Sequence, residues 1–163
     1  MNKLKHYVPC DALLTLYNSL ILPHLNYGIL LWGSKANKLA KLQNKSIRVI
    51  VNAPYNSHIE PIFKALQQLK VTDIYALHGQ KFLYMYENKC LPIYFRSLCL
   101  RHCDNHDFDT RHSDDFQIPA IRHDFARTSI RYILSITYNE CPTPIKEKLY
   151  THSKKGFCNY VKN

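Results

Sequence analysis

A long apolar stretch, from Leu13 to Trp32, constrains what this chain can fold into more than any other feature. Leu, Ile and Tyr fill most of its positions, and it ends on the only Trp of the sequence. A helix of this composition must bury most of its surface. Pro23 lies in the middle, lacks a backbone N–H and clashes with the preceding turn, so it should kink or split that helix. The stretch therefore predicts a buried helix, interrupted near Pro23, around which a core forms.

The same stretch is long enough to raise the question of a membrane span. Its middle carries residues that would be costly in lipid: Asn18, Ser19, Pro23, His24 and Asn26. We therefore expect a buried helix and no membrane partner. The first residues run from lysines into polar positions and Pro9, which is unlike a signal peptide. We expect an intracellular protein, in the nucleus or the cytoplasm, that is not secreted. Its six cysteines should be reduced thiols that mostly fill the core.

Helical patterns continue along the first hundred residues. The chain has only four glycines and few turn signals before Pro92, which favours helices over an all-β architecture. The spacing of apolar residues predicts helices over about 34–51, 58–69 and 73–89. We interpret residues 1–100 as one helical region.

The rest of the sequence has a different character. Residues 101–115 are polar and rich in charge, and they predict an exposed loop. Alternating and β-branched residues over 116–138 predict a small β-hairpin. Pro142 should open a C-terminal helix, or a pair of helices, reaching to about Tyr160. The expected fold class is mainly α, a helical bundle followed by the hairpin and C-terminal helix of residues 116–163.

Residues 34–51 show the clearest amphipathic pattern of the chain. Their basic residues recur every three or four positions and form what we call the basic ridge: Lys35, Lys38, Lys41, Lys45 and Arg48. In residues 1–53, seven basic residues stand against Asp11 alone. Such a ridge can follow nucleic-acid phosphates, releasing counterions as it binds. The same pattern also suits an ordinary solvated helix face, and both interpretations stay open.

A series of different short motifs extends along nearly the whole chain. They are Leu16-Tyr17, Ser19-Leu20, Pro23, Leu25, Tyr27-Gly28, Trp32-Gly33, Leu42-Gln43-Asn44-Lys45, Ile47-Arg48, Pro61-Ile62-Phe63, Asp73-Ile74-Tyr75, Leu91-Pro92, His106-Asp107-Phe108-Asp109-Thr110-Arg111, Ser129-Ile130-Arg131 and Pro144-Ile145-Lys146. In this order they resemble the region that follows the polymerase palm in LINE-type, jockey-like (non-LTR) retrotransposon reverse transcriptases. The resemblance implies that residues 1–100 form a thumb-like region and that the basic ridge lies at or near the surface that grips template and primer.

The sequence also departs from the family pattern. The ridge is interrupted by the uncharged Asn44 and Ser46. The family's C-terminal Trp-Asn and Leu-Pro pairs are replaced by Tyr138-Asn139 and Cys141-Pro142, and Gly156 falls within the expected last helix. These differences indicate decay or divergence near the C-terminus.

The catalytic motif of the family has no counterpart here. Polymerases of this kind hold two metal ions on adjacent Asp residues that follow Tyr or Phe and a small residue. Asp114-Asp115 is the only Asp pair, and it follows His112-Ser113 in the polar loop. The resemblance therefore implies a fragment that lacks the catalytic core, needs no cofactor and is not an enzyme on its own.

One cluster contains residue types that bind zinc: Cys99, His102, Cys103 and His106. Its spacing matches no common zinc finger, and four ligands within eight residues would strain a tetrahedral site. We therefore expect no metal.

Three functional interpretations remain. The first is sequence-tolerant binding of RNA or an RNA–DNA hybrid through the basic ridge. The second is a protein-interaction module that docks on a reverse transcriptase core or another protein. It would use the apolar surface that faces the palm in a complete polymerase and is exposed in a fragment. The third is a non-functional remnant. Salt-sensitive binding to nucleic acid would separate the first from the second.

Overall fold

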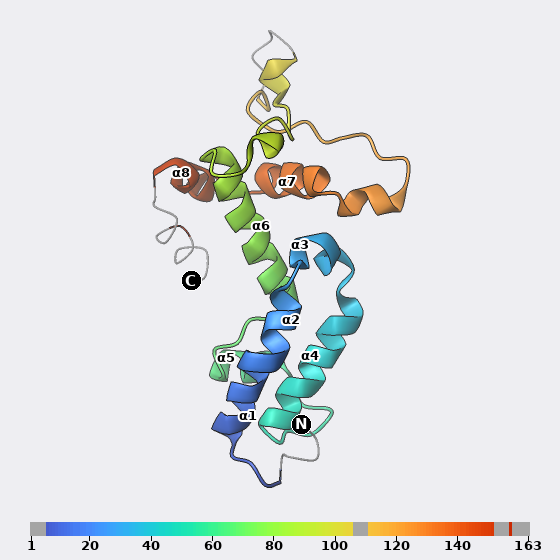
Figure 1. Cartoon of the computed structure of the whole chain (residues 1–163), viewed down its shortest axis with the longest axis vertical. Coiled ribbons are helices and arrows are strands. Elements are labelled where there is room, and N and C mark those ends of the chain that lie inside the picture. Colours follow the sequence, from blue (N-terminus) through green and yellow to red (C-terminus); the bar gives the residue numbers. More distant parts are fainter. Residues whose placement is uncertain (1–5, 106–110, 152–156, 158–163) are drawn as a thin grey trace. The chain divides into compact units, whose positions relative to one another are not determined.

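The computed structural model describes residues 6–105, 111–151 and 157, and this part of the chain is mainly helical (Figure 1). The mainly α class is confirmed. The chain divides into two compact units, Met1–Tyr75 (unit 1) and Ala76–Asn163 (unit 2), and each has hydrophobic clusters of its own. Helix α6 (Val71–Glu87) begins in unit 1 and continues in unit 2. No helix in the described ranges combines the length and the apolar character needed to cross a bilayer.

The apolar stretch forms several short helical segments instead of one long helix. They are α1 (Cys10–Leu16), the π-helical η1 (Tyr17–Ile21), α2 (Leu22–Asn26) and α3 (Ile29–Trp32). The wide π turn directly precedes Pro23, which stands in the first turn of α2 where a missing N–H costs little. The sharper change of direction comes at Gly28, whose φ of 61° is left-handed. Glycine adopts this conformation without steric cost.

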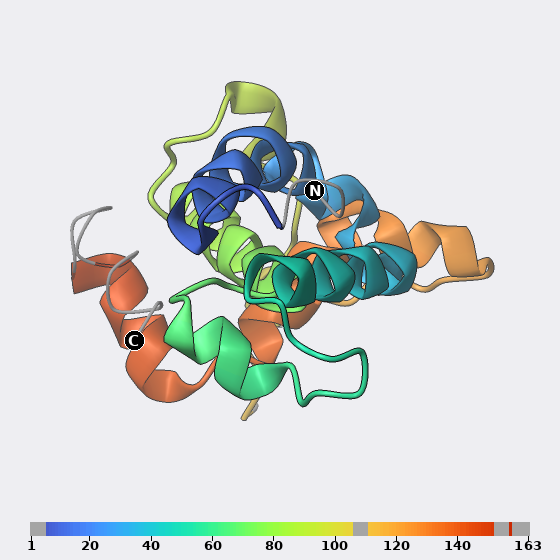
Figure 2. The same ribbon diagram turned by 90° about the horizontal axis from the view of Figure 1, so that it is seen from below.

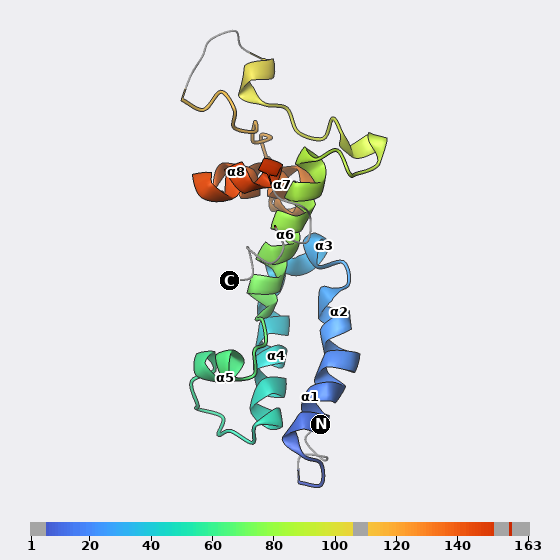
Figure 3. The ribbon, with the colours of Figure 1, turned by 90° about the vertical axis from the view of Figure 1, so that its left-hand side faces the viewer.

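The core of unit 1 forms where α1 and η1 pack on α4 (Asn37–Ile50) and α5 (Glu60–Ala65). Figures 1 and 3 show α1 and α4 side by side. The fully buried side chains there include Leu13 and Tyr17 on one side and Ile47 and Ile50 on the other. A second cluster joins Ile29, Ala36, Val71 and Ile74. The inner face of α4 is therefore apolar, as its sequence pattern predicts.

A close approach at Gly33, in the 3₁₀ turn η2 (Gly33–Lys35), yields the first prediction. A Cβ at this position would lie 2.9 Å from Cγ of Tyr75 and 3.1 Å from Cγ1 of Ile29. Gly33→Ala should therefore lower the free energy of unfolding by about 1–3 kcal/mol through overpacking, measured by urea unfolding.

The matched control is Gly79→Ala in α6, where the new Cβ would meet Thr137 at 3.6 Å, an ordinary contact. There alanine should leave stability unchanged or raise it by up to about 1 kcal/mol through its higher helix propensity. Equal changes for the two variants would show that the Tyr75 ring moves aside without cost.

Unit 2 packs the second part of α6 with α7 (Ile130–Asn139) and α8 (Thr143–Thr151). Short 3₁₀ turns punctuate the connections: η3 (Ile93–Phe95), η4 (His102–Asp104) and η5 (Asp124–Thr128). Buried aromatic side chains fill much of the core: Tyr84, Phe116, Tyr138 and Phe157. Tyr84 stacks on Phe157 with 5.1 Å between ring centroids, so a residue close to the C-terminus belongs to this core.

The β-hairpin predicted over 116–138 is wrong. The hydroxyl of Ser129 accepts a hydrogen bond from the Tyr132 N–H and starts helix α7, which brings Leu134 and Tyr138, four residues apart, into the core. Within the described ranges, the strand-like pairing is a single antiparallel bridge between Arg101 and Phe116. Packing of one helical face therefore overrides the strand propensity of the isoleucines and tyrosines. Residues 152–156 and 158–163, where the C-terminal helix was expected to continue, lie outside the described ranges.

Candidate nucleic-acid interface

A buried side-chain amide adds hydrogen bonds to the apolar packing of helix α4. Gln43 is 2% exposed and faces the interior of unit 1. Its Nε2 donates to the hydroxyl of Tyr17 at 2.8 Å and to the carbonyl of Leu69 at 2.9 Å, and its Oε1 accepts from the Val71 N–H at 2.8 Å. Three partners from two segments, Tyr17 in η1 and residues 69 and 71 at the start of α6, satisfy both amide donors and the acceptor. These bonds fix the rotation of α4 about its own axis.

Burial raises the pKa of the Tyr17 hydroxyl, although the hydrogen bond from Gln43 acts in the opposite direction. Tyr17 therefore stays neutral at physiological pH and remains an acceptor for the amide.

With its inner face fixed, α4 turns the basic ridge outward. Lys35, Lys38, Lys41 and Lys45 are exposed, and Arg48 is half-buried. From Lys38 to Arg48 the four basic residues of α4 fall within an arc of about 80° and span about 15 Å along the axis. Lys35 lies in η2, just before the helix begins. The structure thus gathers the predicted site residues on one side of one helix, extended by the turn in front of it.

Basic residues outnumber acidic ones in unit 1, the unit that contains the ridge. This unit carries nine basic and three acidic residues. Glu60 pairs with Lys70, and that hydrogen bond lowers the pKa of the carboxyl. In the part of the chain that the structure describes, Lys38, Lys41 and Lys45 form no ion pair. Their charge is available to an external anion.

Arg48 differs from the lysines in a way that its spacing does not reveal. Its Nη2 donates to the carbonyl of Ser57 at 3.1 Å, and its Nε is buried without a hydrogen-bond partner. The guanidinium carbon lies 5.8 Å from the ring centroid of Tyr55, within cation–π range. Arg48 therefore uses part of its hydrogen-bonding capacity on the connection 51–59, leaving three lysines of α4 as the freely accessible cations.

Tyr55 is not predicted as a site residue by the sequence pattern. The side chain is 84% exposed and stands beside the end of the basic ridge. The available signal was a lone aromatic residue after Pro54 in an otherwise polar segment, seven residues after a ridge arginine.

The Cys and His residues near position 100 that the structure describes lie in different environments. Cys99 is buried, Cys103 is exposed, and His106 lies outside the described residues. Burial raises the pKa of the Cys99 thiol, and its sulfur lies 3.7 Å from the Ser135 hydroxyl. Over the described ranges, no three His, Cys, Asp or Glu side chains are arranged to hold a metal ion.

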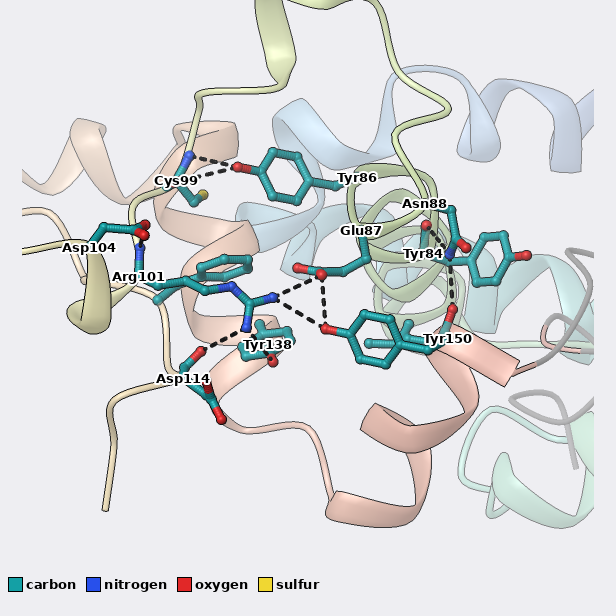
Figure 4. A network of polar contacts seen from close by, with 12 residues as sticks. Tyr84, Tyr86, Glu87, Asn88, Cys99, Arg101, Asp104, Asp114, Tyr138 and Tyr150 are labelled. Atoms are coloured by element: carbon teal, nitrogen blue, oxygen red, sulfur yellow. Dashed lines mark hydrogen bonds and ion pairs between the residues drawn. The ribbon is translucent and has the colours of Figure 1, made fainter. Parts of the chain in front are cut away.

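Unit 2 contains a partly buried polar network around Arg101 (Figure 4). Nη2 of Arg101 donates to Oε2 of Glu87 at 2.9 Å and to the hydroxyl of Tyr150 at 3.2 Å. Tyr150 in turn donates to the same Glu87 oxygen at 2.9 Å. The Arg101 guanidinium also lies over the rings of Phe116 and Tyr138. Oε2 of Glu87 has two partners, whereas its Oε1 is buried without one, and the network joins α6, α8 and the residues around 101.

The electrostatics of this network agree with a structural role. Burial alone would lower the pKa of Arg101, but the hydrogen bond with Tyr150 and the charge of Glu87 outweigh it and raise that pKa. Burial likewise raises the pKa of Tyr150. Both groups therefore keep their protons throughout the physiological range and offer no group poised for acid–base exchange.

No protein-family model, curated protein or solved structure matches this chain.

Proposed function

We propose that this chain binds RNA or an RNA–DNA hybrid with little sequence preference through the basic ridge. In this proposal it is a fragment similar to the post-palm region of LINE-type reverse transcriptases, without a polymerase site of its own, and it acts in the nucleus or the cytoplasm. The observation that carries the proposal is the row of lysines without ion pairs at positions 38, 41 and 45, on a helix whose opposite face Gln43 fixes. Lysines in this arrangement contact phosphates, which carry no direct sequence information.

A salt series on the purified chain tests this proposal. Three phosphate contacts to a duplex predict a slope of about −2.7 in log affinity against log salt. A fourfold rise in salt concentration should then weaken binding to a labelled RNA–DNA hybrid about 40-fold. Binding that does not respond to salt would contradict the proposal.

Neutralising the lysines should locate the contacts. We expect Lys38→Gln, Lys41→Gln and Lys45→Gln together to weaken hybrid binding at least about tenfold and to remove most of the salt slope. The measurement is fluorescence anisotropy at several salt concentrations.

A matched control removes three exposed cations that lie elsewhere: Lys64→Gln, Lys89→Gln and Arg122→Gln. Its net charge changes by the same amount, so diffuse attraction would weaken equally. Equal losses for the two triple variants would show that the ridge is not the binding surface.

A second candidate function is docking on a protein, such as a reverse transcriptase core. It is favoured by three large apolar side chains that stand exposed in the first helical segments, Leu20, Tyr27 and Leu31. Concentration-dependent association that does not respond to salt would support this function, whereas a non-cooperative thermal transition would point to a non-functional remnant.

A further inference from the structure

An exposed aromatic ring stands at the end of the basic ridge. Tyr55 lies in the connection 51–59, which Figure 2 shows running from the end of α4 to α5. Its side chain is 84% exposed, while the Arg48 guanidinium carbon lies over the ring at 5.8 Å from the centroid. A ring in this position contributes little to the core of unit 1. It does place a large flat apolar surface beside the row of cations.

The backbone that carries this ring is held by hydrogen bonds. The Ser57 N–H donates to the carbonyl of Pro54 at 3.1 Å, which closes a turn with Tyr55 at its second position. The Ser57 hydroxyl donates to the same carbonyl at 2.7 Å. Arg48 donates to the carbonyl of Ser57, and the Ala53 N–H donates to the carbonyl of Arg48 at 2.9 Å. The turn is thus tied to the end of α4, so little backbone freedom is lost when a ligand stacks on the ring.

We propose that Tyr55 is a stacking platform for an unpaired base, and that the preferred ligand of the basic ridge is a nucleic acid with a single-stranded segment. The lysines follow the phosphates of that segment, Arg48 covers the ring from one side, and the base stacks on the ring's accessible surface. Every base has a flat face, so such stacking tolerates any sequence. A continuous blunt duplex keeps its internal bases stacked on one another and cannot offer one to the ring. This inference rests on the proposed function of the ridge and specifies its substrate class.

The experiment compares a labelled single-stranded RNA with a blunt RNA–DNA hybrid of the same sequence, using the whole chain. The unaltered protein should bind the single strand more tightly. Tyr55→Ala should weaken single-strand binding about tenfold, because base–aromatic stacking contributes about that factor, and should change hybrid binding less than about twofold. Tyr55→Trp should retain the preference. Tyr94→Ala, at another exposed tyrosine, is the matched control and should change neither affinity.

The possible outcomes distinguish the stacking role of Tyr55 from nucleic-acid binding by the basic ridge. If Tyr55→Ala weakens both ligands equally, or neither, while the ridge lysine variant still loses affinity, the stacking role is overturned and the ridge remains the binding surface. If the triple variant at Lys38, Lys41 and Lys45 also binds both ligands as the unaltered protein does, the ridge is not the binding surface and the stacking proposal is contradicted with it.

Discussion

Arg101→Met should lower the free energy of unfolding of unit 2 by about 3 kcal/mol, the largest effect of a single arginine in this chain. Methionine keeps much of the apolar packing on Phe116 and Tyr138 but removes the cation beside Glu87. The Glu87 side chain is 7% exposed, so its carboxylate would remain buried without an opposite charge. Breaking a buried ion pair from one side costs about 3–5 kcal/mol, and Arg101, at 27% exposed, should fall at the lower end. Hydrogen exchange of α7 and α8 amides measures this loss directly.

Two further variants test the cause. Arg127→Met removes an arginine whose pair with Asp124 spans 3.8 Å at the surface, and it should change stability by less than about 1 kcal/mol. Arg101→Met combined with Glu87→Leu should lose less stability than Arg101→Met alone, since no charge is then left buried. If the double variant loses as much stability as Arg101→Met alone and Glu87→Leu alone added together, the buried unpaired charge of Glu87 is not the cause of the loss.

Gln43→Leu should destabilise unit 1 by about 3 kcal/mol or more. Leucine fits the apolar surroundings, but the substitution leaves the Val71 N–H, the Leu69 carbonyl and the Tyr17 hydroxyl without their present partner. Each unsatisfied buried group costs about 1–3 kcal/mol. The only Trp of the chain, Trp32, packs against the Ile29 cluster of unit 1, so its fluorescence during urea unfolding reports this loss.

The neighbouring Leu42 supplies the control for Gln43→Leu. Leu42 is 60% exposed on the same helix, and Leu42→Ala should change stability by less than about 0.5 kcal/mol. An expectation based on residue type alone, that an apolar side chain contributes more to stability than a polar one, would reverse this order. If Leu42→Ala proves the more damaging variant, Gln43 does not fix α4.

The sequence predicts most of what depends on local periodicity. The opposition of charged and apolar residues in 34–51 gives both the helix α4 and the direction of its basic ridge, and Pro23 marks the place where the helical geometry changes. The hairpin prediction fails because isoleucines and tyrosines suit a strand as well as a helix. What decides the case is the cap at Ser129 and the packing of Leu134 and Tyr138 on residues distant in the sequence.

Features that depend on distant partners escape prediction entirely. Gln43 reads as one more polar position of a charged helix, yet its hydrogen-bond partners are 26 and 28 residues away. Arg101 lies in a segment predicted to be an exposed polar loop, but its contacts with Glu87 and Tyr150 leave its side chain only 27% exposed. Tyr55 becomes noticeable only once the turn at Pro54 places it beside Arg48.

The place of Phe157 in the core of unit 2 sets an order of events during synthesis. The clusters of unit 1 are complete once residue 75 has been made, whereas the stack of Tyr84 and Phe157 waits for about 80 further residues. At about 5–20 residues per second, that interval lasts about 4 to 16 s. During this interval the basic ridge of unit 1 is already formed, whereas the core of unit 2 cannot yet form. The nascent chain therefore carries the full charge of the basic ridge before the core of unit 2 can close.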